Sequence, residues 1–490
     1  MTDEKQLYEE LLTIDERCPK SGDISPVDVR IHEGLTRDET WSEKRRTEDG
    51  GEEVVSVRGT VWSDAIQAAL DSNAAVKIPL LDTPIYLDRP IVLHSGNRLL
   101  VDSQTEIRLV PAAGVCLVRN ENVVSGQYGP VELCRGADTD IVVEGGIWTD
   151  YRTAFVTDGD NPLPSESIHG LHGLFSFHNV ESVRIGGLTI REGSDFGVQI
   201  GNCRDFVVED LTFDEHHRDG VHLEGPAMGG IVRGLRGKTG DDVVALNAWD
   251  WESCSVTFGP ISDVLVEDVT SVPKWTWSEL RLLAGTKNFD NGESVACDIT
   301  RCVFRNIRNI HTVKMYDQPN IGMPDKDFAD PIGRLRDIFF SNLHISGMER
   351  DRYYCEKDAV FEVCADIDGM SVSGARLDFC PGIDDGRSVR LVAVGPMSTT
   401  WPLPAGDPRG EWLELFSPDI DCTVQDLSVS GVVAASPDRP DTAAPVDEAE
   451  RLVMVRSQHP NPDFPETQPR GGTGRGQLTN LVVNGKQVNL

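Results

Sequence analysis

Three aspartates lie in two short segments whose spacing would bring their carboxylates together. Asp219 belongs to HHRDGVHLEGP and the pair Asp241 and Asp242 belongs to TGDDVVALNAWDW. Counted from Asp219 as position i, Asp241 is position i + 22. If that interval is one turn of a stacked structure, the two side chains lie roughly 5 Å apart, the spacing of neighbouring strands. Carboxylates at that distance repel each other, so the pKa of at least one should rise.

Clustered carboxyl groups of unequal pKa are suited to glycosidic cleavage, in which one protonates the leaving oxygen and another activates water. The alternative is that DG and GDD are ordinary turns, because Asp favours turns and Gly permits positive φ. The catalytic interpretation therefore depends on whether the chain repeats with a period of about the same length as this interval.

A recurring strand pair with such a period runs through the chain. The pattern is apolar-x-apolar-x-x-apolar-x-apolar, often ending in Gly, as in VESVRIGGLTI (180–190) and RDFVVEDLTF (204–213). The steps from Val183 to Phe206 and from Phe206 to Gly230 are almost equal in length to the interval between the aspartates. A period in the low twenties predicts an all-β solenoid with one coil per repeat. The alternative, a β-sandwich, would not keep this spacing.

The two ends of the chain differ from its centre. Residues 1–57 are charged and are predicted to form a separate extension, and residues 58–490 the solenoid. A helix over about 64–72 would shield the open end of the first coil. Residues 396–418 and 432–475 are rich in Pro, Asp, Gly and Thr, which predicts long loop insertions.

Composition excludes several classes of partner. The formal net charge is −34, so nucleic acid and anionic membranes are poor partners. The sequence has no run of eighteen apolar residues, so no membrane span is expected. The opening MTDEKQLYEE is acidic and does not look like a secretory signal. The eleven scattered cysteines suit buried reduced thiols, and no His/Cys cluster suggests a metal. We therefore expect a cytoplasmic protein without metal or cofactor. The oligomeric state stays open.

The central region resembles a known enzyme family. The run FSFHNVESVRIGGLTIREGSDFGVQIGNCRDFVVEDLTF, then RDGVHLEG and TGDDVVALN, is similar to polygalacturonases, glycoside hydrolase family 28. The helix and strands at 58–110 resemble the N-terminal cap of the pectin-lyase-like superfamily. The similarity covers roughly residues 58–350. It implies a right-handed parallel β-helix, an inverting hydrolase and no metal.

The resemblance also assigns roles to the three aspartates. Asp219 matches the Asp of the family's Asn-Thr-Asp motif, and Asp241 and Asp242 match its Gly-Asp-Asp motif. By this match, Asp241 is the general acid, and Asp219 and Asp242 hold the attacking water.

The chain departs from the family at the sites that hold substrate. The Gly-His-Gly motif should fall near 275–285, where there is neither His nor Gly-x-Gly. At the Arg-Ile-Lys motif, Lys314 matches the Lys but Thr312 replaces the Arg. His217 and Arg218 replace Asn-Thr. The resemblance therefore carries the carboxylate chemistry but not the galacturonan substrate.

Other polar and aromatic residues near the aspartates are candidate sugar ligands. Alternation along VHLE points His222 and Glu224 outward beside Asp219, although an exposed strand His is an equal alternative. Tryptophans stack on sugar rings or pack loops, and cations bind carboxylates or hydroxyls. The predicted substrate-binding residues are His222, Lys314, Arg281, Trp249, Trp277, His217 and Glu224.

These observations predict an inverting glycoside hydrolase that acts on an oligosaccharide. Two substrate classes stay open: an oligosaccharide that contains a uronide, and one built from other sugars. Long loops that close one end of a groove would favour exo-action. Two rivals remain. One is a lyase or an intramolecular glycosyl transferase on the same fold. The other is a non-catalytic carbohydrate-binding or tailspike-like β-helix.

Overall fold

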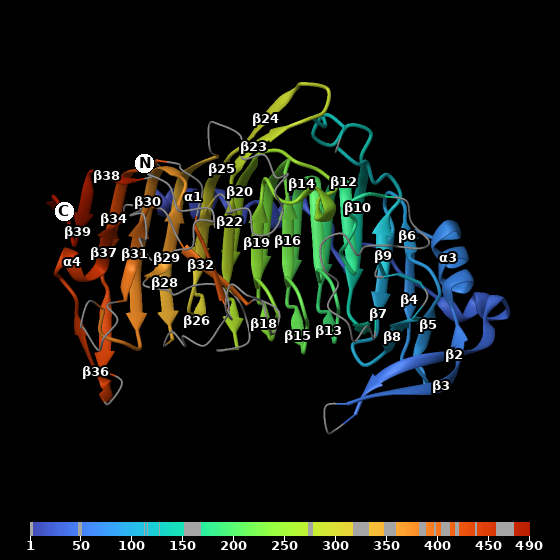
Figure 1. The fold of residues 1–490 in the computed structure, drawn as a ribbon. Coiled ribbons are helices and arrows are strands. Elements are labelled where there is room, and N and C mark those ends of the chain that lie inside the picture. Colours follow the sequence, from blue (N-terminus) through green and yellow to red (C-terminus); the bar gives the residue numbers. More distant parts are fainter. Residues whose placement is uncertain are drawn as a thin grey trace.

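The protein is a right-handed parallel β-helix, seen side-on in Figure 1. This computed structural model describes residues 3–47, 51–111, 113–114, 116–126, 128–150, 168–272, 278–316, 333–346, 359–381, 389–395, 398–402, 412–416, 421–436, 439–456 and 475–490. Three columns of parallel strands form the walls of the solenoid, and each coil passes through the first, second and third wall in turn.

The first wall consists of β1 (Val27–Asp28), β4 (Ala75–Ile78), β7 (Arg98–Val101), β10 (Asp138–Glu144), β12 (Phe175–Gly186), β14 (Val198–Glu209), β17 (Ala227–Arg233), β20 (Ile261–Glu267), β25 (Ile299–Arg305), β28 (Arg334–Ile345), β30 (Asp366–Leu377), β34 (Cys422–Ser430), β38 (Gly476–Thr479) and β39 (Leu481–Val483). The second wall consists of β3 (Glu52–Val61), β5 (Ile85–Leu87), β8 (Glu106–Leu109), β11 (Ile147–Thr149), β13 (Thr189–Arg191), β15 (Thr212–Asp214), β18 (Arg236–Gly237), β21 (Thr270–Ser271), β26 (Arg308–Ile310), the last residues of β28 and β30, and β35 (Val433–Ser436).

The third wall consists of β6 (Ile91–Leu93), β9 (Val118–Asn120), the first residues of β12 and β14, β16 (Val221–Glu224), β19 (Val244–Asn247), β22 (Leu280–Leu283), β27 (Val313–Tyr316), β29 (Ala359–Cys364), β31 (Arg390–Val394) and β37 (Val453–Val455). Antiparallel strands decorate the solenoid: β2 (Arg37–Arg46), β23 (Gly285–Asn288), β24 (Ser294–Cys297), β32 (Ser398–Pro402), β33 (Trp412–Phe416), β36 (Arg439–Pro445) and β40 (Lys486–Val488).

Apolar side chains stack from coil to coil inside the solenoid. Strand register aligns one fully buried row, made of Ile185, Val208, Val232, Val266, Phe304 and Phe340. The rings of Phe304 and Phe340 stack with centroids 4.7 Å apart. Such a continuous row is the structural form of the repeat, because each coil buries its apolar side chains only against its neighbours.

The turn between the first and second walls explains why Gly, Asn or Asp recurs between the two strands of each repeat. Asp210, Asp268, Asn306 and Asn342 hold equivalent places there with φ between 52° and 55°. This left-handed backbone favours Gly, Asn and Asp. Asn342 Nδ2 donates to Asn306 Oδ1 (2.5 Å), and Asn306 Nδ2 in turn donates to Asp268 Oδ1 (3.0 Å). The side chains of successive turns are therefore hydrogen-bonded to one another.

A helix caps the N-terminal end of the core, as the sequence predicts. α3 (Ser63–Ser72) buries Ile66, Ala69 and Leu70 over the first coil, and Figure 1 shows it at that end. None of the described helices, which also include α1 (Glu4–Leu12), α2 (Ile14–Arg17) and α4 (Ala449–Leu452), is long and apolar enough to span a membrane. The ten cysteines in the described ranges all carry free thiols.

Residues 1–57 do not stand apart from the solenoid, contrary to the sequence prediction. β1 pairs with β4 and so begins the first wall, and the predicted boundary at residue 57 falls inside β3. The N-terminal helices lie across the outside of the first wall. Their apolar residues, Leu7, Leu11 and Ile14, cover a row formed by Val207, Ile231, Leu265, Val303 and Phe339.

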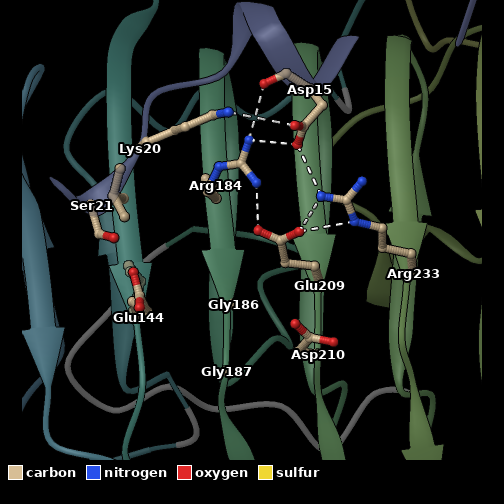
Figure 2. A pocket seen from close by; sticks show the side chains of 12 residues that line it. Asp15, Lys20, Ser21, Glu144, Arg184, Gly186, Gly187, Glu209, Asp210 and Arg233 are labelled. Atoms are coloured by element: carbon tan, nitrogen blue, oxygen red, sulfur yellow. Dashed lines mark hydrogen bonds and ion pairs between the residues drawn. The ribbon is translucent and has the colours of Figure 1, made fainter. Parts of the chain in front are cut away.

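Ion pairs fasten this N-terminal segment to the wall. Asp15 Oδ1 accepts from Arg184 (2.8 Å) and from Arg233 (3.0 Å), and Glu209 binds both arginines from below. These groups line a hollow of about 380 Å³, and Figure 2 shows how their side chains lie. All three cationic groups drawn there, the two arginines and Lys20, face an acid in the same hollow.

The composition of residues 432–475 predicts only a loop, but the described part of this segment also contains strands. Its short strands β35 and β37 continue the second and third walls. Composition missed them because three or four apolar residues are diluted by the Pro- and Asp-rich sequence around them. The described part of 396–418 contains the β32–β33 hairpin.

Candidate active site

The three aspartates meet at the corner where each coil passes from the second wall to the third. Asp219 precedes β16, and Asp241 and Asp242 precede β19, with Val221 opposite Val244. One carboxylate oxygen of each aspartate lies within 4.8 Å of the other two. Register places Asp219 opposite Asp242 rather than opposite Asp241, because this coil is one residue longer than the sequence spacing had suggested.

The three carboxylates differ in their access to solvent. Asp219 and Asp242 are buried, with 1% and 0% exposure, whereas 22% of the Asp241 side chain is exposed. Solvent therefore reaches only Asp241 of the three. Among the three, Asp241 is the carboxylate that a molecule arriving from solvent can touch.

Asp242 is held by two cations and a hydroxyl group. Arg281 Nε lies 2.6 Å from its Oδ2, Lys314 Nζ lies 3.7 Å from its Oδ1, and the Ser278 hydroxyl donates to the same Oδ1. Arg281 and Lys314 are partners on neighbouring strands, β22 and β27. Burial raises the pKa of Asp242 to about 7, even though the two cations oppose the shift.

Asp241 responds in the opposite direction. Burial raises its pKa, but Arg281, Lys314, Arg218 and His222 together outweigh burial and lower it. Arg281 Nη2 lies 3.7 Å from Asp241 Oδ1. Of this pair, Asp242 is therefore the one whose environment favours the protonated form, and the role of Asp241 as general acid stays a prediction.

Asp219 is fixed through both of its oxygens. His222 Nδ1 lies 2.7 Å from Oδ2, and the backbone N–H of Asp242 donates to Oδ1 at 3.2 Å. The His222 ring is stacked on Phe196 with centroids 3.9 Å apart. Because His222 is fully buried, its partner is Asp219 rather than a sugar hydroxyl.

Glu224 is also not the exposed ligand that the sequence predicts. It points outward from the third wall, as alternation requires, but the loop 248–260 covers it. Val256 N and Thr257 N donate to its Oε2 at 2.9 and 3.2 Å, and Gln199 Nε2 donates to its Oε1 at 2.6 Å. Burial raises the pKa of Glu224 to about 7.

The remaining predicted ligands have different fates. Trp249 is 4% exposed and belongs to the apolar core, as the loop-packing alternative requires. His217 is half-buried in the turn before Asp219. Arg281 and Lys314 are buried beside Asp242, with 7% and 3% exposure. Trp277 lies outside the described residues.

Two further polar residues extend the row of the carboxylates. The row occupies one position on successive coils, two residues before the third-wall residues that pair in register. Its members are Asp219, Asp242, Ser278 and His311. His311 Nδ1 lies 2.6 Å from Glu279, whose carboxylate also accepts from the backbone N–H groups of His311 and Thr312. Sequence analysis missed Ser278 and His311 because inserted loops make the steps to them longer than the repeat period.

The spacing of the aspartate oxygens is also one that a divalent cation can bridge. Arg281 and Lys314 already supply two positive charges at this place, however, and would repel a metal ion. The donor set therefore suits a shared proton better than a bound cation.

Comparisons with known proteins give similarities of fold only. No family model and no curated protein matches the chain. The family 28 exopolygalacturonase of Yersinia enterocolitica is 13% identical, with a TM-score of 0.47, over 92% of this chain and 84% of that chain. A GH87 α-1,3-glucanase of Streptomyces thermodiastaticus is 12% identical (TM-score 0.45; 96% of this chain, 70% of that chain). The adhesin PfbA of Streptococcus pneumoniae is 11% identical (TM-score 0.42; 94% and 99%). At these levels none of them assigns a substrate or a catalytic residue to this chain.

Proposed function

We propose that the protein is a glycoside hydrolase that cleaves an oligosaccharide by acid and base catalysis at Asp219, Asp241 and Asp242. The observation that carries this proposal is the unequal trio itself: three carboxylates within 4.8 Å of one another, of which one reaches solvent and another is buried with its pKa raised to about 7. Glycosidic cleavage needs a proton donor and a base side by side.

The roles follow from access and charge. Asp241 contacts the glycosidic oxygen, because it is the exposed member of the trio. A sugar bound against Asp241 displaces water from it and raises its pKa, so the proton held by Asp242 passes to Asp241. Asp241 then protonates the leaving oxygen. Asp219 and the ionised Asp242 take a proton from the attacking water, which restores the number of protons in the trio.

The proposed stereochemical outcome agrees with the resemblance, but it rests on the burial of two carboxylates rather than on the distance between them. Most inverting glycosidases separate their two carboxyl groups by about 6.5–9.5 Å, whereas retaining enzymes keep them about 5–5.5 Å apart. The trio here is closer than the inverting range. We nevertheless propose inversion, with water attacking directly, because Asp219 and Asp242 are too deeply buried to form a bond to a sugar carbon.

We further propose exo-action, because protein fills the third wall on the N-terminal side of the trio. Ser176, His178 and Gln199 are fully buried there. The Gln199 side chain binds the backbone of 170–173 and of Cys254, and His172 binds Ser253 O. A polysaccharide cannot run along those coils, so the substrate must end near Asp241.

The test is a screen of oligosaccharides, with the anomer of the first product followed by proton NMR. The screen includes uronides because Arg281 and Lys314 lie at the trio. Inversion and release of one end sugar are expected. On the substrate found, Asp241→Asn should lower kcat by about 10²–10⁴-fold without changing the fold. The matched control is Asp290→Asn, at an exposed turn. Full activity of Asp241→Asn would refute the assignment of the acid.

One observation favours a second candidate, a non-catalytic carbohydrate-binding β-helix. Asp219 and Asp242 are buried, so a sugar that contacts only Asp241 would bind without reaction. Calorimetric binding of an oligosaccharide without any turnover would support this function. A lyase or transferase would instead give an unsaturated or rearranged product in the same NMR spectra.

A further inference from the structure

A group of buried polar side chains lies directly behind Asp219. It consists of His178, His222, Glu224, Asn247 and Asp250, which we call the polar cluster, and no member is more than 3% exposed. His222 Nε2 lies 3.9 Å from Glu224 Oε1 and 3.8 Å from Asp250 Oδ2. His222 is therefore surrounded by three acids, Asp219 on one side of its ring and two on the other.

The polar cluster contains several buried polar atoms that lack a hydrogen-bond partner. Both ring nitrogens of His178, Nε2 of His222 and Oδ1 of Asn247 are buried without a hydrogen-bond partner. Buried polar groups are nearly always paired, because an unpaired one costs about 1–3 kcal/mol. Unpaired groups gathered beside a reactive carboxylate indicate a functional rather than a purely structural arrangement.

The geometry holds the His222 ring in a single orientation. Phe196 stacks on its face with an interplanar angle of 11°, and Asp219 fixes Nδ1. Asn247 Nδ2 donates to Asp250 Oδ2 at 2.6 Å, which fixes the acid that faces Nε2. A carboxylate accepts only, so the ring must carry its proton on Nδ1, toward Asp219.

We propose that His222 is a positioning residue that donates its Nδ1–H to Asp219 and holds this carboxylate aimed at the attacking water. Asp250 and the ionised form of Glu224 act through the ring: their negative charge opposes loss of the Nδ1 proton. This inference rests on the proposed function, in which Asp219 belongs to the base.

The first test does not require activity. In ¹⁵N-histidine-labelled protein, His222 should give a downfield Nδ1–H proton resonance that is protected from exchange. Asp219→Asn should shift this resonance upfield, and His222→Phe should remove it. A His222 without such a resonance would overturn the positioning role even if the protein hydrolyses sugars. A protein that has the resonance but cleaves no sugar would overturn the proposed function instead.

The second test uses the substrate found in the screen. His222→Phe keeps the ring stacking but removes the donor, so kcat should fall by about 100-fold while KM changes by less than about twofold. His222→Asn, whose amide can donate in place of Nδ1–H, should recover part of the loss. The control is His344→Phe, which breaks another His–Asp pair, 2.9 Å apart and away from the site.

Two outcomes contradict the proposal. A rise in KM with kcat unchanged would make His222 a sugar ligand. If His222→Phe does not fold, Glu224→Gln and Asp250→Asn leave the Nδ1 contact in place, and each should lower kcat by about tenfold, as outer partners of functional groups do. Unchanged kcat in both variants would overturn the shared role of the polar cluster.

Discussion

Arg281 Nε lies 2.6 Å from Asp242 Oδ2, with both side chains almost fully removed from solvent. Buried ion pairs cost desolvation energy that a hydrophobic pair would avoid, so they are poor evidence for stability as such. Breaking one from a single side is nevertheless expensive, because the remaining charge stays buried without its partner. The pair therefore allows a direct test of the charge arrangement in the trio.

Arg281→Met should lower the free energy of unfolding by about 3–5 kcal/mol near pH 8, the usual cost of an unpaired buried charge. At pH 5 the loss should be smaller, because Asp242, with a pKa of about 7, is already protonated there. Denaturant unfolding at the two pH values measures both losses. Arg336→Met, at a pair whose side chains are about half exposed, should cost less than about 0.5 kcal/mol. Equal losses for Arg281→Met at both pH values would contradict the raised pKa.

Glu224 should make the protein less stable as pH rises. Its folded pKa of about 7 lies above the ordinary 4.5, so its contribution is complete below pH 4.5 and is lost as pH rises through 7. Glu224→Gln should remove this slope, which is on the order of 1–3 kcal/mol between pH 5 and 8. Thermal unfolding midpoints across that window measure the slope. The exposed Glu293→Gln should leave it unchanged.

Glu279 is equally buried but should have the opposite effect. Burial raises its pKa, yet His311 and the backbone N–H groups of residues 311 and 312 outweigh burial and lower it. Its contribution is therefore present above the ordinary pKa of 4.5 and is lost as pH falls. Glu279→Gln should flatten the loss of stability below pH 5, by roughly 1 kcal/mol or more. A variant that keeps the wild-type acid slope would show that Glu279 is not held ionised.

Sequence predicts the fold well because the constraint is local and repeated. The sequence intervals from Val183 to Phe206 and from Phe206 to Gly230 are nearly equal, because these residues occupy the same inward-facing position on successive first-wall strands. Gly, Asn and Asp recur because one turn needs left-handed backbone in every coil. The N-terminal helices escaped this reasoning, since spacing shows their apolar face but not the outward row on the first wall that it covers.

The candidate site was predicted only in part, for reasons that concern long-range contacts. The trio follows from one-coil spacing, with an error of a single position in the pairing. The burial of His222 and Glu224 does not follow, because the loop 248–260 that covers them comes from a later part of the chain. Their alternation is correct, but alternation distinguishes core from outer surface and does not show what covers that surface.

The packing of the N-terminal helices should contribute strongly to stability. Leu11 is 2% exposed against the outward apolar row that includes Val207 and Ile231. Leu11→Ala removes buried methyl groups and leaves a cavity, so the free energy of unfolding should fall by about 2–5 kcal/mol. Leu35→Ala is a matched control, because Leu35 belongs to the same N-terminal region but is 48% exposed, and it should cost less than about 0.5 kcal/mol. Denaturant unfolding of the two variants compares them directly. Equal effects, or no effect of Leu11→Ala, would mean that residues 1–57 behave as the separate extension that their charge suggests, and the ion pairs of Asp15 with Arg184 and Arg233 would then not fasten the segment to the wall.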